Sequence, residues 1–272
     1  MNLTCRGAIY AGLLAPLAAL GLAAQNPPTS NFSNSTDAVI PAVIQLLAVG
    51  PGSEGQNQEC SGTGFLVNEE GYILTNAHVM QKGRECLAQS PGTKMVARIA
   101  AARGAHSPAP SHDGPRSGAE SGPAVECDVV ALDELHDLAV IKADHPLRAP
   151  DPGGAVPYVR LDSVDVPSGS RVKVTGHPTF AWVAQTQGGE VLGRKSRALF
   201  EGSTEQTEML VLNFSLKYGS SGSPVYRAAS GGVVGIVERR NTAVEWQTLA
   251  VPIRYAIDLL NRLGVKWYAA PD

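Results

Sequence analysis

The chain has 272 residues, 43% hydrophobic and 17% charged, so it carries enough apolar material for a sizeable core. Its formal net charge is −3 at pH 7, and its basic residues fall in scattered groups such as "GRKSR" and "VERRN", which argues against nucleic acid as a partner. Runs of Val, Ile, Leu and Thr are short and separated by turn residues, a pattern typical of an all-β protein.

Residues 1–24 have the layout of a secretory signal peptide, with Arg6 near the start, an apolar stretch from Ala8 and small residues before Gln25. An uncleaved membrane anchor is the alternative, but the apolar run is shorter than the ~20 residues needed to span a bilayer and contains Pro16. We expect cleavage, a secreted or periplasmic product, and no stable membrane insertion afterwards. Residues 25–37 are polar and aperiodic, which predicts a flexible tether.

Residues 38–150 form the first β-rich half. The segments "AVIQLLAV", "SGTGFLV" and "GYILTNAHVM" follow one another in the manner of a β-meander, the last strand ending near His78. From about 100 to 123 the sequence is rich in Pro, Gly, Ser and His without apolar periodicity, which predicts a disordered surface insertion. Strands resume at "VECDVVALDELHDLAVIKAD".

Residues 151–272 repeat the pattern with "RVKVTGHP", "WVAQTQGGEVLGR", "EMLVLNFS", "GGVVGIVERR" and "WQTLAVPI". The end of the chain differs, because Ile253, Ala256, Ile257 and Leu260 recur at helical spacing and Gly264 stands where a helix cap is expected. The sequence therefore predicts a single amphipathic helix, placed after the last strand.

Three segments together supply the groups that peptide hydrolysis by a serine requires: a nucleophile, an imidazole base and a carboxylate that orients it. "GYILTNAHVM" offers His78, "ELHDLAVIK" offers Asp137 and "YGSSGSPVY" offers Ser221. The order His, Asp, Ser excludes the α/β-hydrolase elbow that "GSSGS" might suggest, because those enzymes run Ser, acid, His.

The blocks "SGTGFLVNEEGYILTNAHV", "DLAVIK", "GSSGSP" and "GGVVGI" resemble those of trypsin/chymotrypsin-fold serine proteases, in particular of the HtrA/Deg branch. The resemblance runs from about Ala38 to Leu263. It implies two six-stranded antiparallel β-barrels, over 38–150 and 151–272, with the C-terminal helix in the second part. HtrA enzymes usually carry PDZ domains after the protease domain, and we expect none in this chain.

Carried over residue by residue, the resemblance makes His78 the general base, Asp137 the orienting acid and Ser221 the nucleophile. It places the backbone N–H groups of Gly219 and Ser221 in the oxyanion hole. The absence of a Cβ at Gly219 suits the backbone conformation that this role requires.

Four neighbouring candidates are not expected to act in these roles: Ser220, Ser223, His136 and His177. The family pattern also places the base of the primary specificity pocket six residues before the nucleophile, at Ser215. This residue is neutral, so an entering Lys or Arg would lose its hydration without gaining a partner. Small or medium aliphatic side chains are favoured, although residues 238–240 follow a pocket-wall strand and could alter the preference.

Three cysteines remain after the expected signal peptide, Cys60, Cys86 and Cys127, and they permit one disulfide in an exported protein. Cys86 and Cys127 lie on segments that resemble adjacent strands of the first barrel, so we expect them to pair; Cys60 with Cys86 is the second possibility. The cysteines stand apart rather than in close pairs, so neither a metal site nor a cofactor is predicted.

The sequence thus predicts an exported serine endopeptidase that acts on unfolded or flexible proteins or peptides through a His-Asp-Ser triad. The alternative is a catalytically silent protein of the same fold that holds peptides without cutting them. The oligomeric state is not predicted.

Overall fold

The structure is a computed structural model that describes residues 39–49, 61–89, 92, 94–100, 121–147, 156–180, 184–198, 204–240, 244 and 246–271. The expected signal peptide, the tether and most of the expected insertion lie outside these residues.

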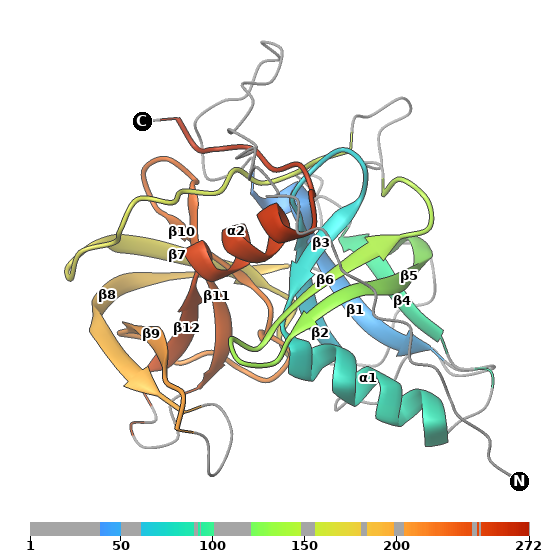
Figure 1. Cartoon of the computed structure of the whole chain (residues 1–272), viewed down its shortest axis with the longest axis horizontal. Helices are drawn as coiled ribbons and strands as arrows, with labels where there is room; N and C mark the ends of the chain where they lie inside the picture. The colour runs from blue at the N-terminus through green and yellow to red at the C-terminus, as the bar shows by residue number, and fades with distance from the viewer. Residues whose placement is uncertain are drawn as a thin grey trace, which may run out of the picture.

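Two closed six-stranded antiparallel barrels stand side by side in the fold (Figure 1). In sheet order, the first barrel consists of β1 (Val43–Val49), β2 (Ser61–Leu66), β3 (Tyr72–Thr75), β6 (Leu138–Ala143), β5 (Ser121–Asp133) and β4 (Lys94–Ala100). The second consists of β10 (Pro224–Arg227), β11 (Val233–Arg240), β12 (Thr248–Pro252), β9 (Thr207–Leu212), β8 (Gln185–Arg197) and β7 (Arg171–Gly176). Closure removes the exposed strand edges that open sheets present. The predicted fold class is confirmed.

The start of β5 falls inside the stretch that we expected to be insertion. Ser121 pairs with Ala100 of β4, so the two strands continue further along each other than their composition indicates. Whether a segment forms a strand depends on the neighbouring strand with which it pairs, and the composition of the segment alone does not show that partner.

The C-terminal helix α2 (Ile253–Arg262) is present where it was predicted. It buries Ile253, Ala256, Ile257, Leu259 and Leu260. Gly264 follows with a φ of 66°, and the N–H of Val265 bonds back to the carbonyl of Leu260 at 3.0 Å, which closes the helix end.

A second helix, α1 (Ala77–Gln89), was not predicted. We expected the strand to run to His78, but β3 ends at Thr75 and the helix begins two residues later. The polar run "QKGRE" hid its apolar face, which includes Met80 and Gly83. A Cβ at Gly83 would lie 2.5 Å from the sulfur of Met95, so this glycine lets the helix pack closely on β4. Two short 3₁₀ turns, η2 (Ile40–Ala42) and η4 (Pro178–Phe180), complete the described helical elements.

The core explains how the barrels are held together. In β12, Ala250 faces the interior of the second barrel, whereas Leu249 and Val251 join the cluster that contains the first barrel's core and the buried face of α2. This is the alternation expected of a strand that is covered on both faces. Helix α2 lies across the front of the junction between the barrels (Figure 1), so its apolar stripe joins them.

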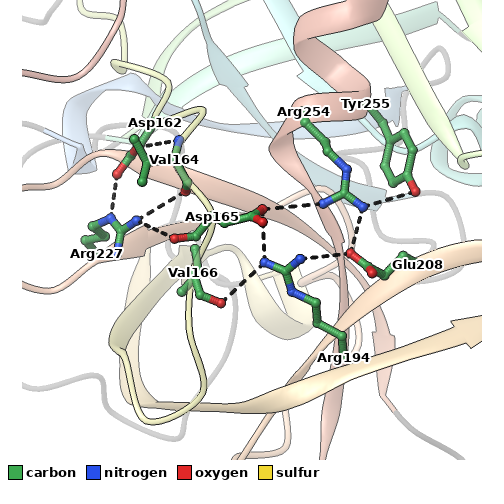
Figure 2. Close-up of polar contacts among 9 residues, drawn as sticks. All are labelled: Asp162, Val164, Asp165, Val166, Arg194, Glu208, Arg227, Arg254 and Tyr255. Atoms are coloured by element: carbon green, nitrogen blue, oxygen red, sulfur yellow. Dashed lines mark hydrogen bonds and ion pairs between the residues drawn. The ribbon is translucent and has the colours of Figure 1, made fainter.

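A network of ion pairs joins α2 to the second barrel and to Asp165 in the segment before β7 (Figure 2). Arg194 of β8 binds Asp165 at 3.1 Å and Glu208 at 3.2 Å. Arg254 of α2 binds the same Glu208 at 2.6 Å. Exposed ion pairs contribute little singly, but a shared network fixes geometry. The result is a fixed position of α2 relative to β8 and β9.

Neither helix in the described part of the chain combines the length and the apolar character needed to cross a membrane.

The expected pairing of Cys86 with Cys127 is wrong, because Cys127 on β5 is a free cysteine. Burial raises the pKa of its thiol to about 12, so the reactive thiolate is scarce at neutral pH. The expectation placed Cys86 on a strand beside that of Cys127, whereas Cys86 lies on α1. Cys60, the partner in the second possibility, lies outside the described residues.

Candidate active site

His78 and Asp137 are brought together at the edge of the first barrel. His78 is the second residue of α1, and Asp137 ends the turn that precedes β6. One carboxylate oxygen of Asp137 lies 2.7 Å from Nδ1 of His78, and the other accepts the backbone N–H of His78 at 2.9 Å. Both carboxylate oxygens therefore contact His78, and Nε2 of the ring has no hydrogen bond to the described residues.

Ser221 lies in the turn before β10, and its loop is tied to the first barrel through Thr63 of β2. The N–H of Thr63 bonds to the carbonyl of Ser221 at 2.9 Å, and its hydroxyl donates to the carbonyl of Gly219 at 2.8 Å. These bonds set the loop against the barrel that carries His78. Sequence reasoning did not single out Thr63, although it stands inside the quoted "SGTGFLV" block.

The hydroxyl of Ser221 donates to the backbone carbonyl of Glu238 on β11 at 3.1 Å. Within the described residues, no hydrogen bond joins Ser221 to His78. The structure therefore brings His78 and Asp137 into contact and holds the Ser221 hydroxyl on the second barrel.

The N–H groups of Gly219 and Ser221 have no hydrogen-bond acceptor among the described residues. The carbonyl of Tyr218 accepts from the N–H of Thr179 at 2.7 Å, and that of Ser220 accepts from Ser223 at 3.1 Å. In a trans peptide the C=O and N–H point in opposite directions. The two unpaired N–H groups therefore point away from these bonds.

The remaining sequence candidates have separate places. Ser215 is half-buried in the connection between β9 and β10. Ser223 is wholly buried, and a Cβ at Gly176 would lie 2.0 Å from its hydroxyl, so it fills space behind the loop. His177 is buried beside Thr63, whose hydroxyl accepts its N–H at 3.0 Å. His136 stacks on Tyr255 of α2.

Comparison with known proteins identifies the family. The family model described as the trypsin-like peptidase domain matches residues 62–236. The chain belongs to this family.

Relatives of the peptidase domain include HtrA-type proteins. A probable periplasmic serine endoprotease of the DegP-like type from Halomonas elongata is 25% identical over 219 residues, covering 78% of this chain and 37% of that protein. The mitochondrial serine protease HTRA2 of Bos taurus is 25% identical over 237 residues, covering 84% of this chain and 43% of that protein. The chain therefore spans about two fifths of these relatives.

Among solved structures, the HtrA-type protease AlgW with a tripeptide superposes with a TM-score of 0.58 at 20% sequence identity, covering 85% of this chain and 62% of that one. Identity at this level supports the shared fold alone.

Gly222 is a position in the peptidase domain where only glycine fits. Its φ is 85°, and a Cβ there would lie 1.9 Å from the carbonyl oxygen of Thr63. We expect Gly222→Ala to lower the free energy of unfolding by about 3 kcal/mol or more, because left-handed strain and backbone overlap add. Gly169→Ala is the matched control, with a φ of 83° but no atom within 4 Å of the added Cβ, and should cost only about 1–2 kcal/mol. Equal losses in urea denaturation would contradict the overlap argument.

Glu238 combines complete burial with a backbone contact to Ser221. It stands at a bulge of β11, where the pairing with β12 shifts between Val237 and Arg239. Its carboxylate binds Arg197 at 3.1 Å and also pairs with Arg239. Burial raises the pKa of Glu238, the two arginines act against this, and the nearby charge of Asp137 adds to the rise. A second carboxylate is thus close enough to Asp137 for the two charges to interact, and the sequence had suggested Glu238 only as a possible influence on specificity.

Arg197→Gln should destabilise the peptidase domain most at alkaline pH, by about 1–3 kcal/mol, because it removes one charged partner of a buried carboxylate. Because the pKa of Glu238 is raised, its carboxylate becomes protonated at a higher pH in the folded protein than in the unfolded chain. The loss should therefore shrink as the pH falls through that range and Glu238 becomes neutral. Urea denaturation at pH 8 and pH 5 measures the loss, with Arg171→Gln, at an exposed residue that begins β7, as control. A loss equal at both pH values would show that the ion pair is not its cause.

Proposed function

We propose that the protein is an exported serine endopeptidase that hydrolyses unfolded or flexible proteins through an acyl-enzyme intermediate. The observation that carries the proposal is the 2.7 Å contact between Nδ1 of His78 and Asp137, beside a serine loop held to the same barrel by Thr63. Membership of the trypsin-like peptidase domain family supports the reaction class. Residues 1–24, together with the periplasmic relative, support export.

The proposed reaction begins when the Ser221 hydroxyl leaves the Glu238 carbonyl and donates to Nε2 of His78. The imidazole takes the proton as Oγ attacks the carbonyl carbon of the substrate, and Asp137 stabilises the imidazolium. The oxyanion is held by the N–H groups of Gly219 and Ser221. His78 then protonates the leaving amine, and water, activated by the same imidazole, hydrolyses the ester on Ser221.

The proposed cleavage preference is for small or medium aliphatic side chains. Ser215 offers no charge to the expected pocket base, and the buried carboxylate of Glu238 is already engaged by Arg197 and Arg239. A Lys or Arg substrate side chain would enter without a free anion to bind. Ser215→Asp should therefore shift the preference toward basic residues, measured as kcat/KM on matched peptides with a basic or an aliphatic residue before the cleaved bond.

Cleavage of one protein in two states tests the proposed substrate class. The mature chain should digest a reduced and alkylated protein and leave the same protein in its native, disulfide-bonded form intact. Ser221→Ala should digest neither. Equal digestion of the native form would contradict a preference for unfolded chains, and binding of the unfolded form without any cleavage would favour the silent alternative.

For the disulfide, we infer that Cys86 pairs with Cys60. The support is the free state of Cys127, which leaves Cys60 as the remaining cysteine after the expected signal peptide. Peptide mapping without reductant should yield one linked pair that contains Cys86, and linkage of Cys86 to Cys127 would contradict the inference.

A further inference from the structure

The turn that carries Asp137 is strained. Asp137 has a φ of 53°, a left-handed conformation that is strained for a non-glycine residue. Such a conformation persists only where the surrounding structure over-determines it. The first barrel supplies part of this support, because the side chain of Asn76 donates to the carbonyl of Asp137 at 3.0 Å.

The second barrel supplies contacts to the same turn. Thr207 of β9 is 1% exposed, and its hydroxyl donates to the carbonyl of Leu135 at 2.7 Å. Tyr255 of α2 stacks on the ring of His136, with the ring centroids 4.1 Å apart and the planes 22° apart. The two residues immediately before Asp137 are thus each held by a residue from the other half of the chain.

The two holding residues are themselves joined. Glu208 follows Thr207 on β9, and Arg254 precedes Tyr255 on α2; their side chains are 2.6 Å apart (Figure 2). Arg254 also donates to the hydroxyl of Tyr255 at 3.3 Å and lies over its ring, 4.7 Å from the centroid. An ion pair therefore fixes the spacing between the hydroxyl that holds Leu135 and the ring that holds His136.

We propose that Thr207 and Tyr255 are positioning residues for the reaction, which hold the Asp137 turn in its strained conformation and so set the contact between Asp137 and His78. The inference rests on the proposed function, in which Asp137 orients His78. Asp137 belongs to the first barrel, but under this proposal the second barrel and α2 help to orient it. His78 is then correctly oriented only when the two barrels are packed against each other.

Thr207→Val tests the inference, because it removes the hydroxyl and keeps the shape. It should lower kcat on an activated ester by about 10-fold to 100-fold, the cost of a small misplacement, and leave KM nearly unchanged. Thr207→Ser should instead keep a kcat close to that of the parent, since serine retains the hydroxyl. Tyr255→Ala should act like Thr207→Val, whereas Tyr255→Phe, which keeps the stacked ring, should stay close to the parent.

The decisive arm repeats Thr207→Val in an Asp137→Ala background. If Thr207 acts through Asp137, the second change should alter kcat by less than about twofold there. Asn68→Ala controls for stability, because Asn68 is buried and donates to the carbonyl of Lys266 beyond α2 at 2.7 Å, away from the Asp137 turn. It should lower stability and leave kcat unchanged.

The inference is overturned if Thr207→Val keeps full kcat, or if it costs the same factor with and without Asp137. If Asp137→Ala itself is severely impaired, either of these results leaves the proposed function intact. Full activity of Asp137→Ala would instead overturn both.

Discussion

Ser221→Ala and His78→Ala should each reduce peptide hydrolysis by several orders of magnitude, and the double variant should lose little more than either single one. The reason is that the hydroxyl and the imidazole act in one step, so removal of either abolishes the same proton transfer. Steady-state hydrolysis of a peptide substrate by the parent, the two singles and the double measures the effect. Additive losses would mean that the residues act separately.

Loss of folding must be distinguished from loss of chemistry in these variants. Ser221 and His78 are partly exposed, so their truncation should cost little stability. The variants should unfold at urea concentrations close to that of the parent. Full activity in Ser221→Ala would refute the mechanism whatever the stability.

Asp137→Asn is the second substitution with a large expected effect. The carboxylate accepts from the backbone N–H of His78 at 2.9 Å and faces Nδ1 at 2.7 Å. An amide can present its NH₂ to Nδ1 and so favour the wrong histidine tautomer, which lowers kcat by about 10⁴ in a well-studied serine protease. We expect a loss of similar size here, with KM much less affected.

Asp162→Asn is the matched control for Asp137→Asn. Asp162 is also a largely buried aspartate; it pairs with Arg227 and accepts the backbone N–H of Val164 at 2.9 Å (Figure 2). It should lower stability and leave kcat near the parent value. A comparable loss of kcat in both variants would mean that the effect of Asp137→Asn reflects general damage rather than orientation of His78.

Many of the strands could be predicted because strand patterns and turn residues are local signals, whereas their arrangement in two barrels was implied by the resemblance to trypsin-fold proteases. The segment "GGVVGIVERR" carries β-branched residues in a short run bounded by turn residues, and it forms β11. Helix α1 escaped prediction because its buried face is short and interrupted by polar residues. The same error led to the wrong disulfide, because Cys86 was assigned to a strand beside that of Cys127.

The candidate site was predictable in part, because the sequence singled out His78, Asp137 and Ser221, and the structure brings the first two into contact. It was not predictable where support comes from distant backbone. Thr63 acts on the Ser221 loop through carbonyl groups, which leave no side-chain signature in the sequence. The place of Glu238 depends on a β-bulge, which a strand pattern does not reveal.

Labelling with a fluorophosphonate probe tests the central claim most directly, because only a serine activated by a neighbouring base reacts at a useful rate. The mature chain should gain one adduct, mapped by peptide mass spectrometry to Ser221, and His78→Ala should lose it. Absence of labelling in the folded parent, or an adduct on Ser220 or Ser223 in place of Ser221, would contradict the account.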